Sequence, residues 1–253
     1  MGNKIIIVRD KDIQRISGLI NSIDSKEFLV YHFFQNDLIE CLNKYAIGKL
    51  IDIGCGNKPY ASIINNKVDK YLGCDIVQSS DNCVDLICEA TSIPLPSESF
   101  DTVLSTQTIE HVANYQDLVN EAYRLLKNDG YFIVSGPMYW PLHEEPYDFF
   151  RFTKHGFKFI LNQAGFEVIE TKSNGGKWAL CGQVILHTLF PEIQKSKRFK
   201  WRILRTIFKS LGGIRGINNF FLKMDLGARN EISTMNYVIV AKKLSSENGS
   251  KRP

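Results

Sequence analysis

The stretch Lys49-Leu-Ile-Asp-Ile-Gly-Cys-Gly-Asn57 joins a short apolar run to two closely spaced glycines. Its apolar residues have the pattern of a strand that is covered on both faces of a sheet. Gly54 and Gly56 lack a Cβ, so the backbone after the strand can turn sharply and lie close to a ligand. The stretch therefore predicts the first strand of a doubly wound sheet, with a nucleotide-like cofactor at its carboxyl end.

The residues after Gly56 help to separate two classes of cofactor. A dinucleotide fingerprint has a third glycine that packs the helix against the strand, and this chain has Pro59 at that position. The segment 52–56, Asp-Ile-Gly-Cys-Gly, instead resembles the first motif of the class I S-adenosylmethionine-dependent methyltransferases. A nicotinamide-dependent oxidoreductase and a non-catalytic binding protein remain open as alternatives, because folds are shared between functions.

Further segments resemble the same family and follow at suitable distances. Asp75 ends a second predicted strand, over 71–75, where a carboxylate can accept hydrogen bonds from both ribose hydroxyls. Residues 89–96 resemble the family's adenine-binding loop, and residues 100–112 resemble its fourth strand and the turn that follows. The resemblance implies S-adenosylmethionine as the cofactor, bound by Asp52, Gly54, Cys55, Gly56, Asp75, Ile76, Glu89, Ala90, Thr106 and Gln107.

The alternation of strands and helices predicts a Rossmann-like α/β fold with a doubly wound, mostly parallel sheet. The resemblance adds a seventh strand, over 236–242, that runs antiparallel and follows a helical insertion. Further expected strands cover 83–88, 102–105 and 131–135, and expected helices cover 12–23 and 26–45. The predicted organisation is an N-terminal helical region over 1–47, a methyltransferase core over 48–172 and 234–244, a basic amphipathic helical insertion over 173–233, and a flexible tail over 245–253.

The loop expected after the fifth strand, residues 137–153, is dense in polar and aromatic side chains. A hydroxyl or amine acceptor must lose a proton when it is methylated, and histidine is the usual base. His143 in this loop and His111 after the fourth strand are the predicted catalytic residues. The predicted acceptor-binding residues are Tyr139, Trp140, Glu144, Tyr147, Asp148 and Arg151. Alternatively, Asp148 and Arg151 pair with each other and the loop is structural.

The same loop resembles the His-Glu-x-Pro-Tyr-Asp-Phe-x-Arg-Phe-Thr signature of bacterial methyltransferases associated with cell-surface polysaccharide synthesis. The resemblance implies methyl transfer to a small molecule or glycan, with O-methylation of a sugar or lipid-linked glycan as the expected reaction. A quinone-like lipid is the alternative acceptor. No nucleic-acid partner is expected.

The predicted insertion carries the basic excess of the chain. Between Ile193 and Lys223 there are nine Lys or Arg residues and no Asp or Glu, so the rest of the chain is net negative. Residues 199–211 place most of their apolar side chains on one arc of a helix and Arg202, Arg205 and Lys209 on the other. This pattern suits an anionic membrane surface, and the competing interpretation is packing on the core or in a homodimer.

Composition narrows the class of protein to which the chain can belong. The chain of 253 residues has 44% hydrophobic and 23% charged residues, which is typical of a globular protein. Its six cysteines form no Cys-x-x-Cys pair, so we expect reduced thiols and no metal site. The apolar run over 5–8 is too short for a signal peptide. We expect a cytoplasmic protein, peripheral at the inner membrane face if the insertion binds lipid.

Overall fold

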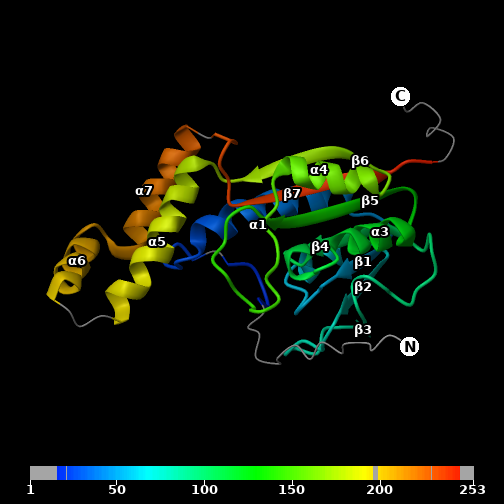
Figure 1. The fold of residues 1–253 in the computed structure, drawn as a ribbon, viewed down its shortest axis with the longest axis horizontal. Coiled ribbons are helices and arrows are strands. Elements are labelled where there is room, and N and C mark those ends of the chain that lie inside the picture. Colours follow the sequence, from blue (N-terminus) through cyan, green and yellow to red (C-terminus); the bar gives the residue numbers. More distant parts are fainter. Residues whose placement is uncertain (1–15, 21, 196–198, 229, 246–253) are drawn as a thin grey trace.

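A seven-stranded sheet runs through the computed structural model of the chain (Figure 1), which describes residues 16–20, 22–195, 199–228 and 230–245. The strand order is β3-β2-β1-β4-β5-β7-β6. Strands β1 to β5 pair in parallel, whereas β7 is antiparallel to both β5 and β6. The predicted fold class is confirmed. The strands are β1 Lys49–Ile53, β2 Lys70–Asp75, β3 Leu86–Ile87, β4 Phe100–Thr106, β5 Leu126–Pro137, β6 Phe166–Asn174 and β7 Asn236–Lys243.

Helices cover both faces of the sheet because successive strand residues point to opposite sides. In β4, Val103 packs in the cluster that includes side chains of α3 and α4, whereas Leu104 packs with side chains of α1. Both are fully buried, which explains the continuous apolar runs of the central strands. The helices beside the sheet are α1 Phe28–Tyr45, α2 Ala61–Ile64, the 3₁₀ helix η1 Ile109–His111, α3 Tyr115–Leu125 and α4 Lys154–Gln163.

Strand β5 begins earlier than predicted. Phe100 pairs with Leu126 and Thr102 pairs with Tyr131, so residues 127–130 form an irregularity in the ladder. Asp129 takes a φ of 64° there, in the left-handed region that Asp tolerates. Residues 127–130, which precede the strand expected over 131–135, thus belong to β5 and form a bulge within it.

The N-terminal region is less helical than predicted. Residues 16–20 and 22–23 form no helix, and the rest of the predicted helix over 12–23 lies outside the described residues. Side chains from distant helices bind this backbone instead of helical partners: the Ile20 N–H donates to Gln35 Oε1 at 3.2 Å. Asn218 Nδ2 donates to the carbonyl oxygen of Ile23 at 2.7 Å. The N-terminal segment is therefore shaped by α1 and α7.

Three helices separate β6 from β7: α5 Lys177–Lys195, α6 Phe199–Ser210 and α7 Gly213–Gly227. Asp225 on α7 is fully buried, and its carboxylate accepts the backbone N–H groups of Gly176, Trp178 and Ala179 at the start of α5. These N–H groups have no partner within the helix, so α7 supplies the cap that α5 lacks. The two helices are thus held together by a polar contact as well as by apolar packing.

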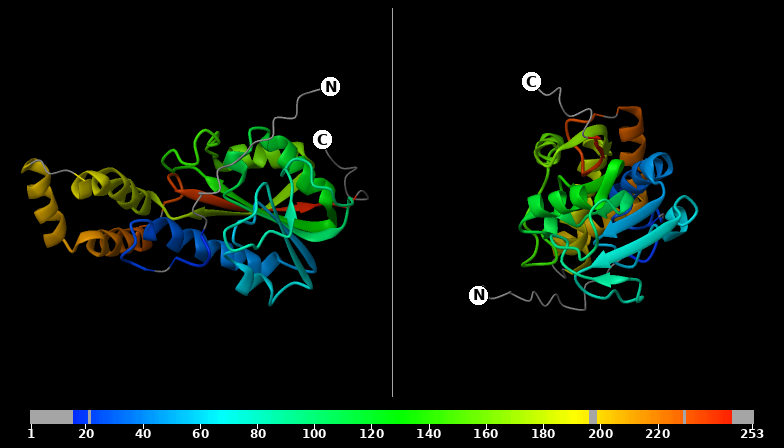
Figure 2. Two further views of the ribbon diagram at one scale, coloured as in Figure 1. Left: turned by 90° about the horizontal axis from the view of Figure 1, so that it is seen from below. Right: turned by 90° about the vertical axis from the view of Figure 1, so that its right-hand side faces the viewer.

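Helix α6 lies at the far end of the insertion (Figure 2). Ile203 and Ile207 on this helix are each 48% exposed, and Leu211 just after it is 66% exposed. Among the described residues, none of the helices combines the length and the apolarity that crossing a lipid bilayer requires. Helix α6 is therefore the part of the insertion with the least apolar burial.

Candidate active site

Two adjoining cavities lie where β1, β2 and β4 end. Their volumes are about 340 Å³ and about 460 Å³, within the range of ligand sites. Four residues line both cavities: Gly54, Asp75, Thr108 and His111. The cavities thus form two arms of one cleft at the carboxyl end of the sheet, the position where doubly wound folds bind ligands.

The glycine loop is held at the junction of the two arms. Gly54 and Gly56 take φ values of 77° and 51°, which L side chains rarely adopt. The Gly56 N–H donates to Asp75 Oδ2 at 3.0 Å, and the Ile76 N–H donates to Asp75 Oδ1 at 2.7 Å. A carboxylate accepts about four hydrogen bonds, so Asp75 can position the loop and also accept ribose hydroxyls.

Residues predicted to bind the nucleoside part of the cofactor line the larger arm, which we call the nucleoside arm. Ile76, Glu89 and Ala90, predicted from the sequence, line it. Val112 and Ala113 add apolar surface, so the arm can hold a flat ring beside the Asp75 carboxylate. Residues of this arm that sequence reasoning did not assign include Thr91, Asn114 and Phe149.

Asp52 lines neither arm, although the motif predicts that it binds the cofactor. It is 1% exposed, and its Oδ2 accepts the Tyr71 hydroxyl at 2.7 Å. Burial raises the pKa of Asp52 to about 7, against the opposing effect of the Tyr71 hydrogen bond. In the structure Asp52 thus links β1 to β2 behind the glycine loop.

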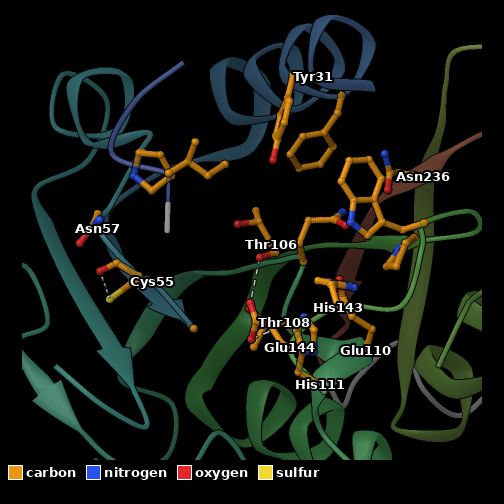
Figure 3. Close-up of a pocket in the computed structure, with 18 of the residues that line it drawn as sticks. Tyr31, Cys55, Asn57, Thr106, Thr108, Glu110, His111, His143, Glu144 and Asn236 are labelled. Atoms are coloured by element: carbon orange, nitrogen blue, oxygen red, sulfur yellow. Dashed lines mark hydrogen bonds and ion pairs between the residues drawn. The ribbon is translucent and has the colours of Figure 1, made fainter. Parts of the chain in front are cut away.

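The smaller arm continues toward the loop after β5, and Figure 3 shows it between the glycine loop and the histidines. Cys55, Thr106 and Gln107, all predicted cofactor residues, line it. Trp140 and Glu144, both predicted acceptor residues, line it as well. Residues predicted for the cofactor and residues predicted for the acceptor therefore line the same arm.

His111 and His143, the two predicted bases, lie against each other at this end. Their ring centroids are 4.7 Å apart in an edge-to-face arrangement. His111 Nδ1 is 2.8 Å from the carbonyl oxygen of Tyr147, and His143 Nδ1 is 3.2 Å from that of Pro141. A carbonyl oxygen only accepts, so both Nδ1 atoms carry the proton and both Nε2 atoms carry a lone pair in the neutral rings.

Glu110 lies beside this histidine pair on η1. It is 1% exposed, and its Oε2 has no hydrogen-bond partner. Burial raises the pKa of Glu110 to about 8, because a carboxylate in an apolar enclosure loses its hydration. Glu110 is not among the residues predicted from the sequence, where its only signal is its position next to His111.

The remaining predicted acceptor residues hold the loop or line the other arm. Arg151 Nη1 and Nη2 donate to the two Asp148 carboxylate oxygens at 2.6 and 2.8 Å, and neither residue lines the cleft. Burial acts to raise the pKa of Asp148, but hydrogen bonds from Arg151 and the His143 N–H outweigh it and lower the pKa to about 2. Tyr139 lies outside both arms, with its hydroxyl 3.4 Å from His187 Nδ1. Tyr147 lines the nucleoside arm.

Other residues of the smaller arm come from distant parts of the chain. Tyr31 and Phe34 reach it from α1, Tyr60 from the segment before α2, and Asn236 from the start of β7. None of these residues belongs to a motif, so only the tertiary fold identifies them. Behind Trp140 lies His187 of α5, with ring centroids 4.9 Å apart. The helical insertion therefore supports one wall of the site.

Comparison with known proteins matches residues 51–134 to the family described as a methyltransferase domain. A 121-residue stretch is 31% identical to a tRNA (carboxymethyluridine(34)-5-O)-methyltransferase of Mus musculus, covering 43% of this chain and 17% of that protein. A 136-residue stretch is 29% identical to a Mycolicibacterium smegmatis protein named a "probable S-adenosylmethionine-dependent methyltransferase", covering 48% of this chain and 53% of that one. The chain thus spans about half or less of the length of these relatives.

The fold also resembles solved structures. A crystal structure of a SAM-dependent methyltransferase from Archaeoglobus fulgidus aligns over 87% of this chain and 95% of that one, with a TM-score of 0.53 and 20% sequence identity. At this identity the likeness concerns the fold.

Proposed function

We infer that this chain, which carries a class I S-adenosylmethionine-dependent methyltransferase domain, methylates a hydroxyl group of a sugar or lipid-linked glycan. The family match over 51–134 confirms the predicted methyltransferase domain and its cofactor. The observation that carries the proposal is the continuous cleft between the Asp75 carboxylate and the Glu110, His111 and His143 side chains. It offers a nucleoside site and an acceptor site that meet at Gly54.

Methyl transfer requires that the protein align the acceptor oxygen, the methyl carbon and the sulfur and that it exclude water. When bound, S-adenosylmethionine supplies a sulfonium-activated methyl group. The acceptor oxygen forms a bond to the methyl carbon as the carbon–sulfur bond breaks, sulfur keeps the electron pair, and the hydroxyl proton leaves. His111 and His143 both line this arm and each has its lone pair on Nε2, so either histidine is a candidate to take that proton.

The lining of the acceptor arm supports a sugar more than an apolar lipid tail. Trp140 and Tyr31 offer aromatic faces, and Glu144 and Asn236 offer polar groups that hydrogen-bond hydroxyls. Two non-glycine residues there, Gln107 and Glu144, both take a φ of 50°. Strained backbone of this kind clusters at functional sites. The resemblance of the loop to polysaccharide-associated methyltransferases agrees with the same acceptor class.

We further propose that α6 binds an anionic membrane surface and so brings the site to a lipid-linked acceptor. Its exposed Ile203 and Ile207 lie on a helix that also exposes Arg202 and Lys209. Arg205 is tied to the core of the insertion, because its guanidinium donates to the carbonyl oxygen of Ile193 on α5. The lipid-facing charges we propose are therefore Arg202 and Lys209, without Arg205.

Calorimetry tests the cofactor assignment directly. The protein is titrated in parallel with S-adenosylmethionine, S-adenosylhomocysteine and NAD. We expect binding of the first two and none of the third. Binding of NAD alone would identify an oxidoreductase, and binding of none would identify a protein that keeps the fold without the cofactor.

The acceptor is tested by methyl transfer from radiolabelled S-adenosylmethionine. Nucleotide sugars, lipid-linked glycans, quinone precursors and transfer RNA are offered separately, and the labelled product is identified by mass. We expect label on a sugar hydroxyl. Label on a quinone or on RNA, with none on the glycans, would refute the acceptor class and leave the enzyme class intact.

A further inference from the structure

Two imidazole nitrogens and one carboxylate oxygen converge at the acceptor end of the cleft. One ligand atom from each of Glu110, His111 and His143 lies within 4.8 Å of the others (Figure 3). Two histidines and one carboxylate form the ligand set of many catalytic zinc and non-haem iron sites. We propose that these three side chains bind a divalent metal ion.

The hydrogen bonds of the two histidines orient them as metal ligands. His111 Nδ1 donates to the Tyr147 carbonyl oxygen, so Nε2 is the nitrogen with the lone pair. His143 Nδ1 donates to the Pro141 carbonyl oxygen and lies 3.2 Å from Asp148 Oδ2. Metal-binding histidines almost always donate their second N–H to a carbonyl or carboxylate in this way.

Glu110 supplies a second and independent observation. Its side chain is 1% exposed, and its Oε2 is a buried polar atom with no hydrogen-bond partner. Arg151 does not neutralise it by contact, because the Arg151 nitrogens donate to Asp148 and to the backbone carbonyls of Trp140, Pro141 and Phe150. A buried, unsatisfied acceptor is costly, and a cation held beside the two Nε2 atoms would satisfy it.

The donor set also narrows the choice of ion. Imidazole nitrogens suit Zn²⁺, Fe²⁺, Co²⁺ and Mn²⁺, whereas Mg²⁺ and Ca²⁺ are bound mainly by oxygen. Ligands about 2.1 Å from Zn²⁺ lie roughly 3.4 Å apart in a tetrahedron, so distances of up to 4.8 Å in the cluster must shorten by up to about 1.4 Å. The His143 side chain is 29% exposed and lies on a loop, so it can move that far more readily than the two buried ligands.

The catalytic role of the ion rests on the proposed function, although its binding does not. An ion at this point lowers the pKa of an acceptor hydroxyl and orients its oxygen toward the methyl group. With both Nε2 atoms bound to the ion, the acceptor proton passes to the Glu144 carboxylate, whose Oε2 lies 4.0 Å from His111 Nε2. The remaining bond changes are those of the methyl transfer described above.

Metal binding is measured on tag-free protein after treatment with a chelator. Co²⁺ is added while its visible d–d absorption is recorded, and equilibrium dialysis with Zn²⁺ gives stoichiometry and affinity. We expect one ion per chain. Glu110→Gln and His143→Ala should each weaken binding by on the order of a hundredfold or more, since changes even to groups that only support the ligands cost 10–100-fold. His155→Ala, on the exposed surface of α4, is the matched control and should bind as the wild type does.

Thermal unfolding with and without Zn²⁺ guards against misfolded variants. The ion should raise the Tm of the wild type and of His155→Ala but not of Glu110→Gln. Binding by all variants alike, or by none, would overturn the proposal and return the histidines to the role of general bases. S-adenosylhomocysteine binding by chelated protein separates the two ideas: retained cofactor binding without metal binding refutes only the metal site. Metal binding without cofactor binding refutes only the proposed function.

Discussion

The two ends of the cleft are built in different ways. The end that we assign to the nucleoside is built from a glycine loop and one carboxylate, Asp75, at the ends of two adjacent strands. The acceptor end combines Tyr31 from α1, Trp140 and His143 from a long loop, and His187 from the insertion behind them. Changes at the nucleoside end should therefore act on cofactor affinity, and changes at the acceptor end on turnover.

Gly54→Val should have the largest effect. A Cβ at Gly54 would collide with the Thr108 side chain, and a φ of 77° is strained for any other residue. We expect cofactor binding to fall below detection in calorimetry, with a loss of about 1–3 kcal/mol in unfolding free energy. Gly156→Ala is the control, because the nearest atom to an added Cβ there is 3.5 Å away. Wild-type affinity in Gly54→Val would contradict the position of the cofactor.

His143→Ala should come next and should affect turnover alone. If its Nε2 takes the acceptor proton or binds an ion, as proposed, turnover should drop on the order of 10²-fold or more. S-adenosylhomocysteine affinity should be nearly unchanged. Steady-state kinetics and calorimetry on the same preparation measure both. If His111→Ala lost turnover selectively while His143→Ala stayed active, the essential histidine would be His111 on η1 and not His143 in the loop.

Asp75→Asn should weaken cofactor binding without abolishing it. The substitution removes the charge from the hydrogen bonds that Asp75 accepts, each worth roughly 1.5–3 kcal/mol. We expect cofactor affinity to fall about 10- to 100-fold, with turnover at saturating cofactor little changed. Asp81→Asn, at an exposed position beyond the same strand, should have wild-type affinity. Equal affinities in the two variants would mean that Asp75 serves only to hold the loop.

Asp225→Ala should weaken acceptor binding indirectly, by loosening α5. The substitution leaves the N–H groups of Gly176, Trp178 and Ala179 without their buried acceptor, at a cost of about 1–3 kcal/mol. We expect increased hydrogen exchange in α5 and a raised KM for the acceptor, because His187 of α5 supports Trp140. Cofactor affinity should not change. If the acceptor KM also stayed constant, the insertion would not contribute to the site.

The smallest effect that we expect is on the binding of α6 to anionic vesicles. Each basic residue near such a surface is worth about 1 kcal/mol, so replacing Arg202 and Lys209 with Ser should weaken vesicle binding roughly 30-fold. Neutral vesicles should not bind, and salt should weaken binding to anionic ones. Lys158→Ser plus Lys154→Ser, at exposed positions of α4, is the charge-matched control. Absence of wild-type binding, together with a dimer that Ile207→Asp dissociates, would make α6 a packing surface.

Most residues predicted to bind the cofactor line the cleft, because their positions are set locally along the chain. Gly54 and Gly56 follow a strand directly, and Asp75 ends the next one, so spacing along the chain determines their position. Asp52 is the exception: the motif includes it, but in the structure its carboxylate accepts the Tyr71 hydroxyl behind the loop. A motif records which residues occur together and not which of them contact the ligand.

Fewer of the residues predicted to bind the acceptor line the cleft, because tertiary contacts decide which side chains reach it. Arg151 and Asp148 have the chemistry of ligand-binding residues, yet they pair with each other within the loop. Tyr31 and Asn236 lie on elements whose patterns indicate only packing, and their proximity depends on how α1 and β7 meet the sheet. Glu110 was overlooked because a single buried carboxylate is visible only once its surroundings are known.

The position of β7 has a consequence for synthesis of the chain. Among the seven strands of the described sheet this one is synthesised last, yet it lies between β5 and β6 and pairs with both. Until residues 236–243 emerge, β5 and β6 each present an unpaired edge of the kind that promotes aggregation. The helical insertion, made earlier, lengthens that interval. A chain that stops before residue 236 would retain the glycine loop, His111 and His143 but would leave both edges unpaired, so we expect it to aggregate.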